Sequence, residues 1–118
     1  MNSTIEIFYY KTSTGKEPFW QWLDRLDIKS RAIIKSRIDR MSCGNFGDAK
    51  NIKNGQGIWE LRIDFGPGFR VYFARVQQVV VIILCAGDKG TQARDIDKAK
   101  KCWNDIRRNY EKENKSKR

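Results

Sequence analysis

The order of hydrophobic and polar positions along the chain predicts one strand, two helices, three more strands and a final helix. Residues 4–10 alternate in part and are rich in β-branched and aromatic side chains, which favours an opening strand. Pro18 suits the first turn of a helix, whose apolar positions follow at helical spacing: Phe19, Trp22, Leu23 and Leu26. Asp27 can cap a second helix, which Gly44 is expected to end.

The second helix is expected to have one apolar stripe and otherwise basic faces. Its stripe consists of Ile34, Ile38 and Met41. The other faces carry several cations and a single acid: Lys29, Arg31, Lys35, Arg37, Arg40 and Asp39. We take Arg31 and Lys35 as candidate anion-binding residues, although a solvated surface is the simpler interpretation of any one of these cations.

The second half of the chain predicts a sheet and a closing helix. Residues 45–57 are polar and rich in glycine, so we expect a loop there. Three antiparallel strands are predicted at residues 58–65, 69–76 and 79–86, and Gly66-Pro67-Gly68 is a strong hairpin signal between the first two. The third strand is apolar on both faces, which predicts a covered, central position. The last helix is predicted from apolar residues at helical spacing: Ile96, Ala99, Trp103, Ile106 and Tyr110.

The order of these elements predicts an α+β fold in which the two-helix hairpin covers one face of the sheet. We expect residues 1–110 to form a single domain. Residues 111–118 carry charge and no core residues, so they are expected to form a flexible basic tail. Of the four tryptophans, Trp22, Trp59 and Trp103 fall on apolar periodicities and are expected in the core, whereas the place of Trp20 stays open.

Composition narrows the class of partner. The chain has 118 residues, and 24 lysines and arginines against 14 acidic residues give it a formal net charge of +10. Such a field favours polyanions, whether nucleic acid, an anionic membrane or an acidic protein. The chain lacks histidine and its cysteines stand far apart, so we expect no zinc site, no imidazole base and no cofactor. No segment resembles a membrane span or a signal peptide, so we expect a cytoplasmic protein.

Alternation along the hairpin predicts that polar and charged side chains project from one face of the sheet. A three-residue connection would place Arg62 beside Tyr72, Asp64 beside Arg70 and Glu60 near Ala74. A shifted register would still leave Glu60 and Arg62 on the same face. These residues either form cross-strand ion pairs or bind phosphate, because a guanidinium grips phosphate oxygens in pairs and tyrosine can stack a base. Both interpretations stay open at this point.

The loop Gly87–Gln92 joins the last strand to the last helix. Its backbone N–H groups, together with Lys89, could hold an anion. Alternatively, Asp88 or Thr91 is only the helix cap.

Three segments together resemble a known family: GIWELR at Gly57–Arg62, GPGFRVYF at Gly66–Phe73, and CAGDKGTQ at Cys85–Gln92 followed by Asp95-Ile96. From about the first strand to Tyr110, the chain is similar to the phage-derived, HigB-like addiction-module killer proteins of the RelE/ParE toxin superfamily. The resemblance implies a RelE-like fold, the toxin role in a type II toxin–antitoxin system, and a cognate antitoxin as partner. The best-known members enter the ribosomal A site and cut mRNA there without a metal.

The resemblance also implies where the site lies, since its motifs carry over to Arg70, to Glu60 and Arg62, and to Lys89. With Tyr72 from the same sheet face, the candidate catalytic residues are Glu60, Arg62, Arg70, Tyr72 and Lys89, and the candidate RNA-binding residues are Arg31, Lys35, Lys53 and Gln92. We hypothesise that a ribose 2′-hydroxyl attacks the adjacent phosphate. Arg62 and Arg70 would stabilise the transition state, and Lys89 would hold a phosphate or protonate the leaving oxygen. Glu60 or Tyr72 would act as base.

Two other functions stay open. A ParE-like inhibitor of DNA gyrase would share the fold without being a nuclease. A non-catalytic module would bind nucleic acid or an antitoxin and cleave nothing.

Overall fold

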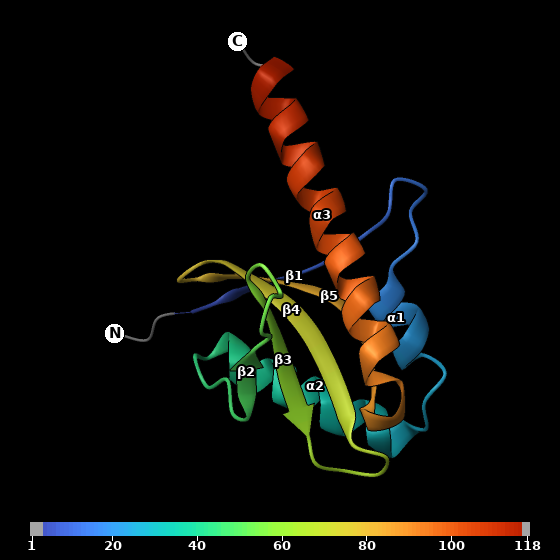
Figure 1. Ribbon diagram of the computed structural model, residues 1–118. Helices are drawn as coiled ribbons and strands as arrows, with labels where there is room; N and C mark the ends of the chain where they lie inside the picture. The colour runs from blue at the N-terminus through green and yellow to red at the C-terminus, as the bar shows by residue number, and fades with distance from the viewer. Residues whose placement is uncertain (1–3, 117–118) are drawn as a thin grey trace.

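A computed structural model describes the backbone of residues 4–116 and the side chains of residues 4–113. The elements follow in the order β1 (Glu6–Tyr9), α1 (Pro18–Leu23), α2 (Ile28–Ser42), β2 (Ala49–Asn51), β3 (Ile58–Ile63), β4 (Phe69–Gln77), β5 (Val80–Asp88), the 3-10 turn η1 (Lys89–Thr91) and α3 (Gln92–Ser116). Figure 1 shows this mixed α+β arrangement, in which α3 crosses the sheet and extends past it.

The strands form one sheet in the order β1-β5-β4-β3-β2. β1 runs parallel to β5, and the remaining neighbours are antiparallel. The predicted opening strand and the three predicted antiparallel strands are confirmed, and β5 is an interior, largely buried strand as its apolar run predicts. The expectation of a loop throughout residues 45–57 is wrong, because Ala49–Asn51 pairs with β3 as the edge strand β2. That strand is short and has no β-branched or aromatic residue, so its sequence carries no strand signal.

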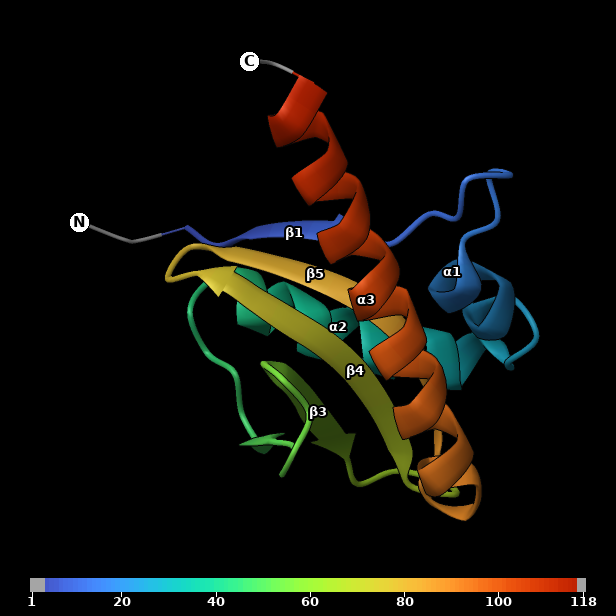
Figure 2. The ribbon, with the colours of Figure 1, turned by 45° about the horizontal axis from the view of Figure 1, so that its top comes forward.

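Helices cover both faces of the sheet (Figures 1 and 2). On one face, α1 and α2 contribute Phe19, Leu23, Ile34, Ile38 and Met41 to a core with Leu61, Ile63, Phe69, Val71 and Phe73. On the other face, α3 contributes Ala99 and Cys102 to a core with Ile58, Tyr72, Ala74, Leu84 and Cys85. The predicted packing of the helical pair is confirmed. Alternate residues of β3 and β4 therefore face different helices.

The helix ends follow the predicted capping residues. Pro18 is the first residue of α1. The Asp27 carboxylate accepts a hydrogen bond from the Ser30 backbone N–H at 3.1 Å and caps α2. Gly44 follows the end of α2 at a φ of +93°, a left-handed conformation that glycine adopts without strain.

The β3–β4 hairpin has a different register from the one that a three-residue connection predicts. We expected Arg62 beside Tyr72 and Asp64 beside Arg70. Instead, Arg62 lies opposite Arg70, and Glu60 lies opposite Tyr72. The partner of Arg62 thus moves from Tyr72 to Arg70, which is an even number of positions. The predicted faces are therefore retained although the predicted pairs are wrong.

The length of the turn explains this register. Ile63 and Phe69 are the last paired residues, so residues 64–68 form the connection. The Gly68 N–H donates to the Phe65 carbonyl at 3.0 Å, which ties the turn together without pairing Phe65 with Phe69. Gly66 and Gly68 both have positive φ. The glycines thus permit a wider turn than the shortest one that their spacing allows.

The C-terminal segment is helical for longer than expected. We expected a flexible tail from residue 111, but α3 continues through Ser116. Residues 117 and 118 lie outside the described part of the chain.

Candidate functional site

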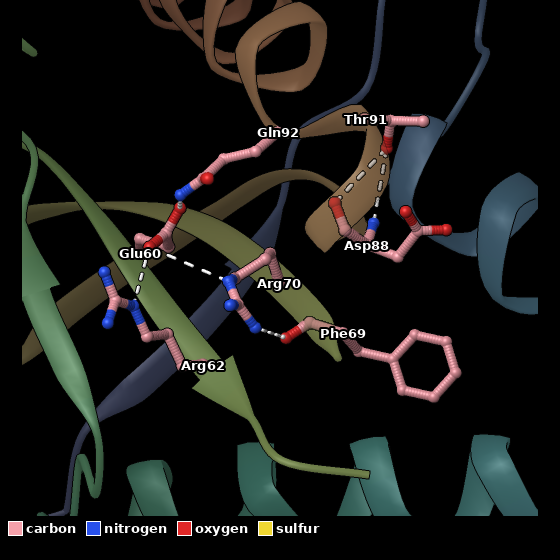
Figure 3. A network of polar contacts seen from close by, with 7 residues as sticks. All are labelled: Glu60, Arg62, Phe69, Arg70, Asp88, Thr91 and Gln92. Atoms are coloured by element: carbon pink, nitrogen blue, oxygen red, sulfur yellow. Dashed lines mark hydrogen bonds and ion pairs between the residues drawn. The ribbon is translucent and has the colours of Figure 1, made fainter. Parts of the chain in front are cut away.

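A buried carboxylate gathers two arginines and a glutamine on the α3 face of the sheet (Figure 3). The Glu60 side chain is only 4% exposed. Its Oε1 accepts a hydrogen bond from Arg62 Nε at 3.1 Å and lies 3.9 Å from Arg70 Nε. Its Oε2 accepts a hydrogen bond from Gln92 Nε2 at 2.7 Å. We call Glu60, Arg62, Arg70 and Gln92 the Glu60 cluster.

The hairpin register creates the Glu60 cluster. Arg62 and Arg70 are directly opposite each other on adjacent antiparallel strands, so their side chains project from the same face. Two like charges in that position repel each other. Glu60 lies two residues before Arg62 and therefore shares its face, which offsets the repulsion with an opposite charge. Gln92, the first residue of α3, supplies the fourth member from above the sheet.

The two arginines of the Glu60 cluster differ in how far their side chains are exposed to solvent. The Arg62 side chain is 36% exposed, whereas that of Arg70 is 12% exposed. Arg70 Nη1 donates to the Phe69 backbone carbonyl at 3.1 Å, which fixes the direction of its guanidinium. Its Nε has no hydrogen bond to any described residue. An anion approaching from solvent therefore meets Arg62 first and finds Arg70 already oriented.

Two titratable groups at the base of the Glu60 cluster have pKa values that are shifted in opposite directions. Burial alone would raise the pKa of Glu60, but hydrogen bonds from Gln92 and Arg62 outweigh burial and hold the pKa below its ordinary value. Tyr72 is fully buried, and burial together with the Glu60 carboxylate raises the pKa of its hydroxyl. At neutral pH, Glu60 is therefore ionised and Tyr72 keeps its proton.

Lys89 lies beside Arg70 because of a close approach at Gly68. The Lys89 N–H donates to the Gly68 carbonyl at 2.8 Å. A side chain at Gly68 would begin 3.5 Å from Arg70 Nη1 and 3.6 Å from Lys89 Cβ. Gly68 also has a φ of +82°. The glycine of the hairpin thus gives room to Arg70 Nη1 and to the Cβ of Lys89, whose side chain is exposed to solvent.

Sequence reasoning missed a further cation of this face, Lys50. It lies opposite Glu60 in the β2–β3 ladder, so its exposed side chain projects from the same face as the Glu60 cluster. The only signal for Lys50 is the pairing of β2, which the residues of that strand do not predict.

The other candidate residues are distributed differently. Arg31 and Lys35 belong to α2, which covers the opposite face of the sheet, so the structure separates them from the Glu60 cluster. Lys53 is exposed in the loop between β2 and β3, and no contact among the described residues joins it to the cluster. Gln92 does join the cluster, but it donates to Glu60.

The loop before α3 is a capping structure. The Asp88 carboxylate accepts from the Gly90 N–H at 2.8 Å, and the Asp88 N–H donates to the Thr91 hydroxyl at 3.3 Å. These N–H groups already have partners, so the capping interpretation of Asp88 and Thr91 is confirmed.

The described residues contain no group of three or more His, Cys, Asp or Glu side chains placed to hold a metal ion. None of the helices in residues 4–116 is long and apolar enough to cross a membrane.

The arrangement as a whole is a cationic surface built around one anion. Lys50, Arg62, Arg70 and Lys89 lie on or beside the same sheet face. Arginine forks bind phosphate oxygens in bidentate fashion, and lysine adds a point charge. This surface is suited to a phosphate group.

Comparison with known proteins places the chain in a family. The model of the family "Phage derived protein Gp49-like (DUF891)" matches residues 21–104, which include the whole Glu60 cluster. The chain belongs to this Gp49-like family. The family is associated with RelE-like toxins.

A relative of this Gp49-like chain occurs in Haemophilus influenzae (strain ATCC 51907 / DSM 11121 / KW20 / Rd). It is 49% identical over 83 residues, which cover 70% of the present chain and 82% of the relative. It is described as an uncharacterized protein. The similarity therefore extends over most of both chains.

Proposed function

We propose that the Gp49-like chain is the RelE-like toxin of a type II toxin–antitoxin system and that it cleaves mRNA on the ribosome. The supporting observation is the placement of Arg62 opposite Arg70, both directed at the buried Glu60 carboxylate. Membership of a family associated with RelE-like toxins supports the same proposal.

The proposed reaction is an attack of a ribose 2′ oxygen on the adjacent phosphorus. The new O–P bond forms a 2′,3′-cyclic phosphate, and the bond from phosphorus to the 5′ oxygen breaks. Negative charge builds up on the phosphate oxygens in the transition state, and fixed guanidinium groups stabilise such charge strongly. Arg62 and Arg70 would supply this stabilisation, because Glu60 holds both in place before the substrate arrives.

Two protons must move in this reaction. The 5′ oxygen gains one, and Lys89 is its proposed donor because it is exposed beside Arg70. The 2′-hydroxyl loses one, and the candidate acceptors are Glu60 and Tyr72. The raised pKa of Tyr72 keeps its hydroxyl protonated, so the proposal assigns the acceptor role to Glu60, which must exchange one of its hydrogen bonds from Arg62 or Gln92 for the 2′-hydroxyl when RNA binds. The proposal therefore needs no metal ion or cofactor.

The proposal includes three partners. A net charge of +10 favours association with mRNA and with the RNA-rich ribosome. A cognate antitoxin would neutralise the toxin, and co-purification of the tagged chain with the product of an adjacent short reading frame tests this partner.

Primer extension on mRNA after induction of the chain tests the proposed activity. The proposal predicts new 5′ ends within translated frames, absent when translation is blocked before induction. A DNA-damage response without new ends would contradict it and indicate a gyrase inhibitor. Growth arrest with neither signal would also contradict it and indicate a non-catalytic binding module.

A further inference from the structure

A cleft of about 330 Å³ lies between α1 and the first turns of α3, and we call it the α1–α3 cleft. Its polar, charged and aromatic lining residues are Gln21, Trp22, Arg25, Arg94, Asp95 and Lys98. None of the cations of the Glu60 cluster lines this cleft.

Cationic groups converge on the α1–α3 cleft from two elements. Arg94 and Lys98 are one turn apart on α3 and therefore project from the same side of the helix. Arg25 follows α1 on the opposite wall. All three side chains are exposed, as an anion-binding surface requires. Their combined charge attracts a phosphate rather than a neutral ligand.

The one acidic residue of the cleft is turned inward. Asp95 is 6% exposed, and its carboxylate accepts a hydrogen bond from the Thr91 hydroxyl. The same carboxylate packs against Gly87, where a side chain would have no room. Asp95 therefore holds the start of α3 against β5, and the three cations of the cleft outnumber this single acid.

The cleft also offers an aromatic surface. Trp22 is half-buried and packs edge-on against Phe69, with ring centroids 5.7 Å apart and planes at 81°. Trp22 is one of the residues that line the α1–α3 cleft. A cationic groove with an aromatic platform is the usual arrangement for holding an unpaired nucleotide, since every base has a face that can stack.

Contacts link the cleft to the Glu60 cluster. The ring of Phe69 packs on Trp22, and its carbonyl accepts from Arg70 Nη1. In the view of Figure 3, Asp88 at the end of β5 and Thr91 in η1 lie on the side of Arg70 that is away from Arg62. Lys89 belongs to the same turn. The path proposed for a single RNA strand leads from Arg62 and Arg70 past Lys89, around the turn between β5 and α3, and into the cleft.

We propose that the α1–α3 cleft binds a nucleotide that flanks the scissile linkage in single-stranded RNA. The base stacks on Trp22, and Arg25, Arg94 and Lys98 hold the phosphate. This inference rests on the proposed function, because it takes RNA as the substrate. It adds a second binding position, separate from the residues that carry out the reaction.

The test is equilibrium binding of a fluorescently labelled oligouridylate to the full chain, measured by anisotropy at several salt concentrations. The variant Arg25→Ala/Arg94→Ala/Lys98→Ala is expected to weaken binding at least about ten-fold. The slope of log affinity against log salt should fall by about 0.7, the value for one phosphate contact on a single strand. Trp22→Phe, which retains an aromatic ring against Phe69, should weaken binding less and leave the salt slope unchanged.

A matched control removes three cations elsewhere. Lys29, Arg40 and Lys112 are exposed on α2 or on the distal part of α3, and their triple alanine variant should bind almost as the wild type does. If the cleft variant binds oligouridylate as tightly as this control, the inference is overturned. It is also overturned if the cleft variant loses affinity for polyglutamate but keeps it for oligouridylate, which would indicate an acidic protein partner.

The outcomes also separate this inference from the proposed function. Wild-type cleavage in cells together with an unaffected cleft variant would reject the cleft and retain the nuclease. Loss of RNA binding by the cleft variant, with no cleavage by the wild type, would retain the cleft and reject the nuclease.

Discussion

Arg62 and Arg70 lie directly opposite each other on β3 and β4, and both direct their Nε atoms at one oxygen of Glu60. Opposed cations on neighbouring strands destabilise a sheet unless an anion lies between them. Glu60 is that anion, and it is nearly inaccessible to solvent. The arrangement keeps two positive charges close together at a surface that can receive a phosphate.

Gln92 is predicted to act through Glu60. Gln92→Ala removes the 2.7 Å hydrogen bond to Oε2, so the pKa of Glu60 should rise toward its ordinary value. Because Glu60 stays ionised at neutral pH and becomes the stronger base, single-turnover cleavage at neutral pH should speed up, by less than about ten-fold. The acid limb of its pH profile should also move to higher pH. Gln78→Ala, in the exposed β4–β5 turn, is the control and should change neither. A Gln92→Ala enzyme with weaker RNA affinity but an unmoved pH profile would show that Gln92 contacts RNA directly.

The Glu60 carboxylate is predicted to stabilise the fold in a pH-dependent way. Because its folded-state pKa is lowered, its contribution is complete above the ordinary value of 4.5 and is lost as the pH falls through the folded-state value. Glu60→Gln should lower the free energy of unfolding by about 1–3 kcal/mol at neutral pH. Urea unfolding of both proteins at a series of pH values should show this difference shrinking only below 4.5.

The matched control for this experiment is Glu6→Gln on the exposed face of β1. It should leave the unfolding free energy nearly unchanged across the same range. A Glu60→Gln difference that persists undiminished in strong acid would show that the carboxylate charge does not support the cluster.

Tyr72 is predicted to be dispensable for cleavage. Its hydroxyl is fully buried beside the Glu60 carboxylate, where it has no route to a substrate. Tyr72→Phe should therefore lower the unfolding free energy by no more than about 1 kcal/mol and leave the cleavage rate unchanged. Chemical denaturation and single-turnover cleavage measure the two quantities. A rate loss of about 10²-fold or more in a folded Tyr72→Phe protein would assign the hydroxyl to the reaction after all.

The two faces of the sheet predict different effects for basic residues. Arg31→Ala/Lys35→Ala alters α2, which lies against the opposite face from Arg62 and Arg70. Cleavage and RNA affinity should match those of the charge control Lys29→Ala/Arg40→Ala on the same helix. A much larger loss of affinity in the Arg31/Lys35 variant would mean that RNA also contacts α2.

Local patterns predict most of the fold because they depend on neighbouring residues. Pro18 and Asp27 start their helices where the pattern places them, and the apolar stripe of α2 is buried as expected. β2 escapes prediction because its formation depends on pairing with β3 and not on its own residues. The extension of α3 past residue 110 is also missed, since its charged residues suit a helix as well as a tail.

The candidate site is predictable in its faces but not in its pairs. Alternation along β3 places Glu60 and Arg62 on one face in any register, and Arg70 shares that face in any register that differs by an even number of residues. The partner of each residue depends on the turn at residues 64–68, whose length the glycine spacing does not fix. Lys50 and the inward orientation of Gln92 follow from tertiary pairing, so one sequence does not show them.

The most direct test of the central proposal is single-turnover cleavage of an mRNA on programmed ribosomes by Arg70→Ala, beside the wild type and Arg70→Lys. Loss of one fixed cation at the developing phosphate charge should slow cleavage about 10²- to 10³-fold. Arg70→Lys should fall between the two because lysine lacks the guanidinium fork. The melting temperature of each protein establishes that it is folded. Cleavage by a folded Arg70→Ala protein at the wild-type rate would contradict the account.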